Sequence, residues 1–97
     1  MAGYLIANLD VHDPDMFAKY RDQVTPLIAR FGGRYLIRGG ELEHVEGHMP
    51  VKRLVVLEFP TLDAARTFYE SPDYESVLPL RLQSTHSEVA LVEGYAG

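Results

Sequence analysis

Two oppositely charged side chains, Arg38 and Glu58, fall in neighbouring strand-like segments, at alternating positions that place both on one face of a sheet. Asn8 shares that face from a third segment. A charge pair in an apolar setting is costly unless its geometry is good, so it needs a reason. The three residues could hold a small anionic or carbonyl ligand. Alternatively, Arg38 and Glu58 form an ion pair that fixes how two sheets dock, and such structural pairs are the more common case.

A second candidate set combines two tyrosines with an arginine. Tyr74 and Arg81 are seven residues apart, and Tyr69 precedes them closely in the sequence. This spacing brings two side chains to one face of a helix. A tyrosine hydroxyl and a guanidinium beside an apolar pocket could hold a carboxylate or an enolate-like oxygen. The alternative is structural: Tyr69 is a core aromatic with its hydroxyl at the rim, and Arg81 caps a helix end.

The histidines form no recognisable metal motif. His44 and His48 have an i, i+4 spacing with Glu46 between them, but Gly47 disfavours the helix that would bring them to one face. We therefore expect exposed loop histidines, no metal site and no cofactor. His86 precedes the last predicted strand and could act as a general base or a haem ligand.

Composition excludes several classes of protein. The chain has 97 residues and no cysteine, which excludes disulfides, thiolate metal sites and a cysteine nucleophile. Its 9 Lys and Arg against 14 Asp and Glu give a net charge of −5, and the basic residues are scattered. This argues against nucleic acid or an anionic membrane as a partner. Apolar runs of about five residues are too short to span a bilayer. We expect one cytoplasmic domain over residues 1–97.

The first half of the chain predicts two strands and a helix. Residues 4–11 alternate between apolar and mixed positions, as in a strand. Asp13 and Pro14 then start a helix, because aspartate caps free amides and proline fits the first turn. Apolar residues at spacings of three and four continue to Gly32-Gly33, which ends the helix. Residues 34–38 predict the second strand.

The second half begins with residues 41–53, a connection longer than a tight hairpin needs. Residues 54–59 predict the third strand. Helices are predicted over 61–69 and 71–82, each starting at a threonine or serine that can cap free amides. Residues 88–93 predict the last strand.

This β-α-β-β-α-β order predicts an α+β fold of the ferredoxin-like type, with a four-stranded antiparallel sheet and the helices on one face. The other face carries four apolar residues that no helix can cover: Ile6, Leu36, Leu54 and Val56. A half-exposed sheet should be polar on its outer face. The economical cover is a second copy of the same sheet, because two-fold dimers are the commonest assembly. We therefore expect a homodimer formed through the open sheet face.

Several short segments strengthen this interpretation by their order and spacing. They are Gly3-Tyr4, Gly32-Gly33-Arg34, Arg38-Gly39-Gly40, Leu57-Glu58-Phe59-Pro60, Ser71-Pro72-Asp73-Tyr74 and Val92-Glu93-Gly94. Over nearly its whole length the chain resembles domain-of-unknown-function family number 1330, in the dimeric α+β barrel superfamily. The resemblance implies a ferredoxin-like protomer and a face-to-face dimer whose sheets form a barrel. It implies no reaction, because the wider superfamily includes small monooxygenases, muconolactone isomerases and haem-dependent enzymes.

Three functions remain open at this point. The first is a homodimer that binds a small organic molecule in the barrel. The second is a cofactor-free monooxygenase or isomerase, which needs a base or acid of tuned pKa; Glu58, His86 and Tyr74 are the candidates. The third is a structural or regulatory dimerisation module. The candidate ligand contacts are Asn8, Arg38, Glu58, Tyr69, Tyr74, Arg81 and His86.

Overall fold

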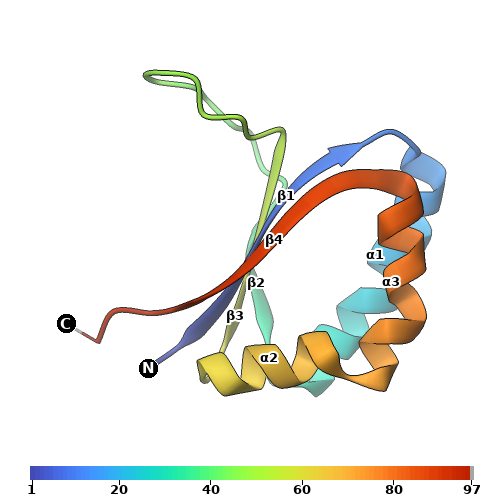
Figure 1. Cartoon of the computed structure of the whole chain (residues 1–97), viewed down its shortest axis with the longest axis vertical. Helices are drawn as coiled ribbons and strands as arrows, with labels where there is room; N and C mark the ends of the chain where they lie inside the picture. Colours follow the sequence, from blue (N-terminus) through green and yellow to red (C-terminus); the bar gives the residue numbers. More distant parts are fainter. Residues whose placement is uncertain (97) are drawn as a thin grey trace.

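Seven elements follow one another along the chain in the computed structural model, which describes residues 1–96. They are β1 (Gly3–Val11), α1 (Pro14–Arg30), β2 (Arg34–Arg38), β3 (Arg53–Phe59), α2 (Leu62–Glu70), α3 (Pro72–Ser84) and β4 (Thr85–Glu93). The strands form a four-stranded antiparallel sheet in the order β2-β3-β1-β4, and the helices lie on one face of it (Figure 1). The predicted ferredoxin-like architecture is confirmed.

The central strand β1 shows which face of the sheet is buried. Its alternate residues Leu5, Ala7 and Leu9 are at most 5% exposed. Leu5 lies opposite Leu57 of β3, which is buried as well. Ile6 points to the opposite face and is 37% exposed. The alternation of the sequence thus separates a core under the helices from an open face.

α1 begins where Asp13 and Pro14 predict it. Oδ1 of Asp13 accepts a hydrogen bond from the backbone N–H of Met16 at 3.1 Å, which satisfies one of the free amides. The chain leaves the helix through Gly32, whose φ of 82° is favourable for glycine. Three residues on the inner side of α1 are buried: Phe17, Val24 and Ile28. Neither α1, with 17 residues, nor any other helix within residues 1–96 is long and apolar enough to cross a membrane.

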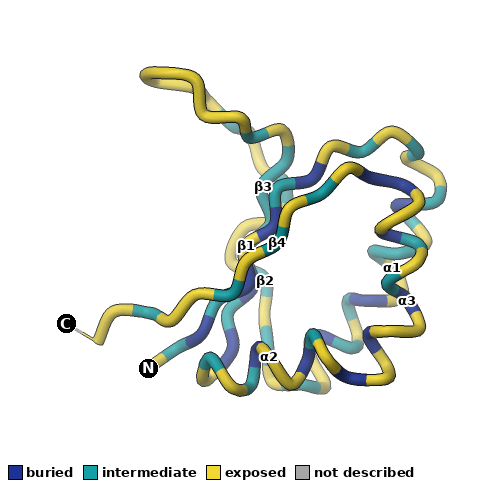
Figure 2. Tube along the Cα trace, in the orientation of Figure 1, coloured by how far each residue is buried: buried dark blue, intermediate teal, exposed yellow. Residues whose placement is uncertain are grey.

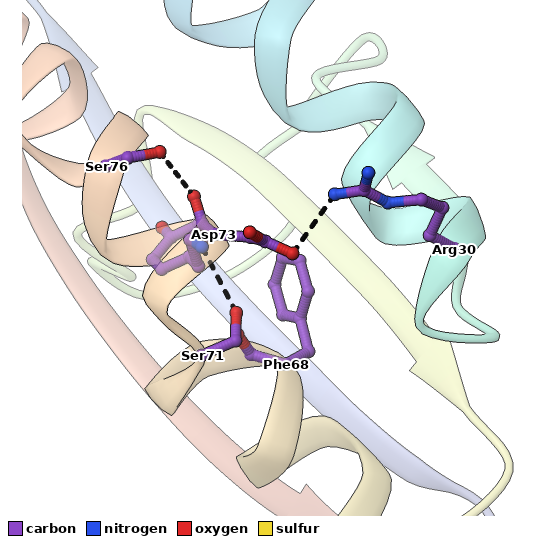
Figure 3. A network of polar contacts seen from close by, with 6 residues as sticks. Arg30, Phe68, Ser71, Asp73 and Ser76 are labelled. Atoms are coloured by element: carbon purple, nitrogen blue, oxygen red, sulfur yellow. Dashed lines mark hydrogen bonds and ion pairs between the residues drawn. The ribbon is translucent and has the colours of Figure 1, made fainter.

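Ser71 ends α2 and caps α3 at a tight junction. Its hydroxyl donates to the carbonyl of Phe68 at 2.7 Å and accepts from the backbone N–H of Tyr74 at 3.1 Å. In the first turn of α3, the carboxylate of Asp73 accepts a hydrogen bond from the guanidinium of Arg30 at 3.1 Å (Figure 3). These contacts tie α3 to both α1 and α2.

α3 is longer and β4 starts earlier than the sequence predicts. The expected boundaries were Leu82 for the helix and Glu88 for the strand, but α3 continues to Ser84 and β4 begins at Thr85. The hydroxyl of Thr85 donates to the carbonyl of Arg81 at 2.7 Å. This bond satisfies a carbonyl at the end of the helix and lets the strand follow without a loop.

An irregularity in β2 reverses the expected side of Arg38. The pairing with β3 shifts between Tyr35 and Ile37, so that β2 contains one extra residue there. Arg38 consequently lies opposite Val55, which packs against the core under the helices. The prediction that Arg38 shares the open face with Glu58 is therefore wrong.

Residues 39–52 contain no helix or strand and extend away from the sheet (Figure 1). Figure 2 shows most of this segment as exposed, and Val45 is 89% exposed. It corresponds to the long connection predicted for residues 41–53. Both predicted loop histidines, His44 and His48, lie in it and are exposed.

Candidate functional site

A cavity of ≈ 40 Å³ lies between the helices and the inner face of the sheet. Much of its wall is apolar and includes Leu5, Leu9, Val24, Ile28, Leu57 and Val89. The polar residues that border it are arginines and tyrosines: Arg21, Arg38, Arg53, Arg81, Tyr20, Tyr35 and Tyr74. A void needs roughly 10–15 Å³ for each water, so the cavity has room for about three waters or for the head group of a small organic molecule.

Arg81 is the most deeply buried charged residue at the cavity. It lies in the last turn of α3, on the same side as the buried residues Tyr74 and Val77, and is 4% exposed. Its Nη1 donates to the hydroxyl of Ser87 at 2.7 Å and its Nη2 to the hydroxyl of Tyr69 at 3.0 Å. Its Nε is buried and has no hydrogen-bond partner. One donor of this buried guanidinium is therefore left without an acceptor in the protein.

Arg81 also lacks an anionic partner. Within the described residues, no carboxylate lies within 4.0 Å of the guanidinium nitrogens of Arg81, Arg53 or Arg38. Burying a charge is expensive unless an opposite charge or strong hydrogen bonds compensate for it. The Arg81 cation is stabilised in part by the C-terminal end of the α3 dipole and by the hydroxyl oxygens of Ser87 and Tyr69. An anion in the cavity would complete this compensation.

Arg53 and Arg38 add positive charge from the sheet. The guanidinium of Arg53 lies over the ring of Phe17, 5.4 Å from its centroid, and its Nε is buried without a partner. A Cβ at Gly39 would overlap this guanidinium, so a larger residue there would displace it, and the φ of 69° at this position is itself favourable for glycine. The guanidinium of Arg38 lies over the ring of Tyr35 at 4.7 Å. Stacking on aromatic rings holds both cations while leaving N–H donors free.

Two tyrosine hydroxyls meet at the cavity wall. The hydroxyl oxygens of Tyr20 and Tyr74 are 2.9 Å apart, and Tyr74 is 2% exposed. Burial raises the pKa of Tyr20, and the neighbouring Tyr74 raises it further. Burial also raises the pKa of Tyr74, although the guanidinium of Arg81 acts in the opposite direction. Both phenols therefore stay protonated near neutral pH, where they serve as hydrogen-bond donors and not as bases.

The structure brings the second predicted set together. Tyr69 accepts a hydrogen bond from Arg81, and Tyr74 and Arg81 both border the cavity. The rings of Tyr69 and Tyr74 lie 5.0 Å apart between centroids. The spacing along the sequence thus identified three side chains that do lie together in space. Whether they contact a ligand stays a prediction.

Arg38 and Glu58 do not form the expected pair. Glu58 lies on the open face of the sheet, where its carboxylate is 2.8 Å from the guanidinium of Arg34. It also accepts a hydrogen bond from the hydroxyl of Tyr4 at 3.2 Å. The extra residue in β2 removes Arg38 from this face and leaves Arg34 as the partner, because Arg34 lies before the irregularity.

Asn8 and His86 belong to the open face as well and do not border the cavity. The side chain of Asn8 donates to the carbonyl of Pro50 at 2.7 Å and accepts from the backbone N–H of Lys52 at 3.0 Å. Asn8 therefore fastens the end of the extended segment to β1. The ring of His86 lies 5.1 Å from that of His12. Among residues 1–96, no group of three or more His, Cys, Asp or Glu side chains is placed to hold a metal ion.

Sequence reasoning missed four of the polar residues that border the cavity: Tyr20, Arg21, Tyr35 and Arg53. Arg53 has the same strand parity as the core residues Val55 and Leu57, which is a signal that it points under the helices. Tyr20 follows Phe17 at a spacing of three, among the apolar positions that predict α1. The periodicity of the sequence therefore places both Arg53 and Tyr20 on the core side of their elements. It does not predict that the two residues border one cavity, because that depends on how α1 packs over the sheet.

The open face of the sheet carries a set of exposed apolar residues. Ile6 is 37% exposed, Ile37 is 40% exposed and Leu36 is 45% exposed. Val56 lies opposite both Ile6 and Ile37, at the middle of this patch. The protomer's own helices all lie on the other side of the sheet (Figure 1). This open-face patch, defined by Ile6, Leu36, Ile37 and Val56, is therefore uncovered in the single chain.

One protein family matches almost the entire chain. It is the family described as domain of unknown function (DUF1330), and the match covers residues 2–95. No curated protein sequence matches the chain.

Several solved structures are similar in fold. A protein of unknown function from Rhodopseudomonas palustris, RPA0582, has a TM-score of 0.75 at 15% identity, covering 99% of this chain and 84% of that one. A dimeric ferredoxin-like protein of unknown function from Jannaschia sp. CCS1 has a TM-score of 0.71 at 14% identity, covering 97% and 100%. SnoaB, a cofactor-independent oxygenase from Streptomyces nogalater, has a TM-score of 0.62 at 17% identity, covering 99% and 95%. At these identities the similarity shows the fold alone.

Proposed function

We propose that this chain, which belongs to the DUF1330 family of domains of unknown function, is a homodimer that binds a small organic anion between its helices and its sheet. One observation carries the proposal. Arg81 is 4% exposed at the wall of a cavity, with a buried Nε that no protein atom accepts from. A buried guanidinium without a carboxylate partner is a natural receptor for a carboxylate or an enolate-like oxygen.

The rest of the cavity supports an organic anion in preference to an inorganic one. Apolar side chains make up much of the wall, and they favour a hydrocarbon body next to the charged group. The hydroxyls of Tyr20 and Tyr74 add a neutral donor near Arg81, since their raised pKa values keep them protonated. The protein as a whole has a net charge of −5, so the anion is attracted by this local arrangement and not by the overall charge.

The proposal includes a homodimer in which each protomer covers the open-face patch of the other. An exposed apolar patch on one face of a sheet is rarely left bare in a monomeric protein. Similar structures from Jannaschia sp. CCS1 and Thermobifida fusca are described as dimeric ferredoxin-like proteins, which agrees with this arrangement. We also propose the cytoplasm as the location of the protein. Neither nucleic acid nor an anionic membrane is a partner in this proposal, because the net charge of −5 opposes both.

A cofactor-free enzyme is the second candidate, and one observation favours it. Guanidinium and phenol donors around an apolar cavity would stabilise an enolate or phenolate, the kind of anion that an oxygenase or isomerase without a cofactor must form. The bases named from the sequence are poorly placed for that chemistry. Glu58 and His86 lie on the open face, and burial keeps Tyr74 protonated. Binding is therefore the function that the geometry supports best.

A comparison of an acid with its amide tests the proposal. Hexanoate should raise the melting temperature of the protein at pH 7, because a ligand that binds only the folded state stabilises it in proportion to RT ln(1 + [L]/Kd). Hexanamide has the same body but no charge, and should leave the melting temperature within about 1 °C of the ligand-free value. Thermal melts at increasing ligand concentration measure both effects. Equal effects of acid and amide would refute anion recognition, and no effect of either would favour a purely structural dimerisation module.

A further inference from the structure

A second, larger hollow adjoins the cavity. It has a volume of ≈ 360 Å³ and lies where β1 passes into α1, next to the start of β3. We call it the outer hollow, and the cavity beside Arg81 the inner cavity. Four residues border both: Leu9, Phe17, Arg21 and Arg53. The stacked pair of Arg53 and Phe17 therefore stands between the two spaces.

More than half of the basic residues of the chain border the two hollows. The inner cavity is bordered by Arg21, Arg38, Arg53 and Arg81, and the outer hollow adds Lys52, so five of the nine Lys and Arg lie at this one site. Neither hollow is bordered by an acidic residue or a histidine. Along the described chain, the only carboxylate within 4.0 Å of any of the five is Asp22, at the limiting distance of 4.0 Å from Nε of Arg21.

The two spaces differ in size, so each can accept a different part of a ligand. The inner cavity of ≈ 40 Å³ accepts little more than a carboxylate, which is comparable to about three waters. The outer hollow of ≈ 360 Å³ accepts a chain or ring, and its wall includes the apolar residues Leu9, Val11, Pro14 and Phe17. A ligand that is held by Arg81 and is larger than a carboxylate would therefore have to extend past Arg53 toward the outer hollow.

We infer that the ligand is an elongated organic dianion, with one acidic group at Arg81 in the inner cavity and a second acidic group at Lys52 and Arg21 in the outer hollow. This inference rests on the proposed function and specifies the class of ligand. Lys52 is exposed and the side chain of Arg21 is 40% exposed, so water solvates both cations in the free protein. A second acidic group would add a partly exposed charge pair with them, which a monoanion cannot form. Arg53 lies between the two positions and can donate to either acidic group.

Matched pairs of straight-chain acids test the inference. Dissociation constants are measured by calorimetry on the intact protein for butanoate and succinate, hexanoate and adipate, and octanoate and suberate. Within at least one pair, the dianion should bind about fivefold or more tightly than the monoanion, since one partly exposed charge pair contributes about 1 kcal/mol. The advantage should depend on chain length, because the chain must be long enough to reach both sites.

Two variants locate the second acidic group. Lys52→Gln should remove most of the advantage of the dianion, measured as the ratio of the dissociation constants of monoanion and dianion for the same variant. Lys19→Gln is the matched control, since Lys19 is exposed and borders neither hollow, and it should preserve the advantage. Equal affinities for monoanion and dianion in all three pairs would overturn the dianion inference while leaving the proposed function intact. An advantage that survives Lys52→Gln would likewise overturn the placement of the second group. Failure of every acid to bind would overturn the proposed function itself.

Discussion

Replacement of Val56 by aspartate should dissociate the dimer, raising its dissociation constant on the order of a hundredfold or more. Val56 lies in the middle of β3, opposite Ile6 on one side and Ile37 on the other. In the face-to-face dimer, the new carboxylate of each protomer would be buried in the interface without a partner. The desolvation of these charges opposes association. Sedimentation velocity at several micromolar concentrations measures the change.

Glu43→Lys is the control for this variant. Glu43 lies in the extended segment that precedes β3 and is exposed, so a change of its charge should leave the dimer intact. Equal effects of the two substitutions would mean that the open-face patch is not the interface. A wild-type protein that sediments as a monomer at every concentration would contradict the dimer itself.

Replacement of Arg81 by methionine should strongly weaken the binding of organic acids while leaving the fold as stable as before or more so. The affinity for hexanoate should fall about a hundredfold, because charge-assisted hydrogen bonds from a buried guanidinium are lost. The free energy of unfolding should stay the same or rise by about 1 kcal/mol, since methionine fills a similar volume without a buried, uncompensated charge. Thermal melts and calorimetry on the same samples measure the two quantities together.

Arg66→Met provides the matched loss of one positive charge. Arg66 lies on α2, its side chain is 47% exposed, and it pairs with Asp63 at the surface. This variant should bind hexanoate as the wild type does and change stability little. If Arg81→Met instead destabilised the protein strongly and left the affinity for hexanoate unchanged, Arg81 would be a purely structural residue.

The fold was predictable because each of its signals is local. Alternation in β1, the caps Asp13, Thr61 and Ser71, and the apolar side of α1 each depend on neighbouring residues in the sequence. The order of the elements then leaves few topologies open. Tyr74 and Arg81 were likewise paired through their helical spacing, and Tyr69 through its nearness in the sequence.

The error at Arg38 has a different origin. Strand parity holds only while the pairing is regular, and one extra residue between Tyr35 and Ile37 reverses it. Nothing in the segment Arg34–Arg38 marks the irregularity, because it is a property of the pairing between β2 and β3. The shift moved Arg38 from the expected ion pair to the border of the inner cavity. The face of a sheet on which a charged side chain lies is thus harder to predict than the sheet itself.

The most direct test of organic-anion binding at Arg81 is a crystal structure of the protein grown with a saturating concentration of hexanoate. We expect one hexanoate in each protomer, between the helices and the sheet, with a carboxylate oxygen about 2.7–3.2 Å from Nε of Arg81. Its hydrocarbon chain should pass Arg53 toward the outer hollow. Hexanoate bound only between the two sheets of the dimer, or a fully ordered protein whose inner cavity contains no hexanoate, would contradict the account.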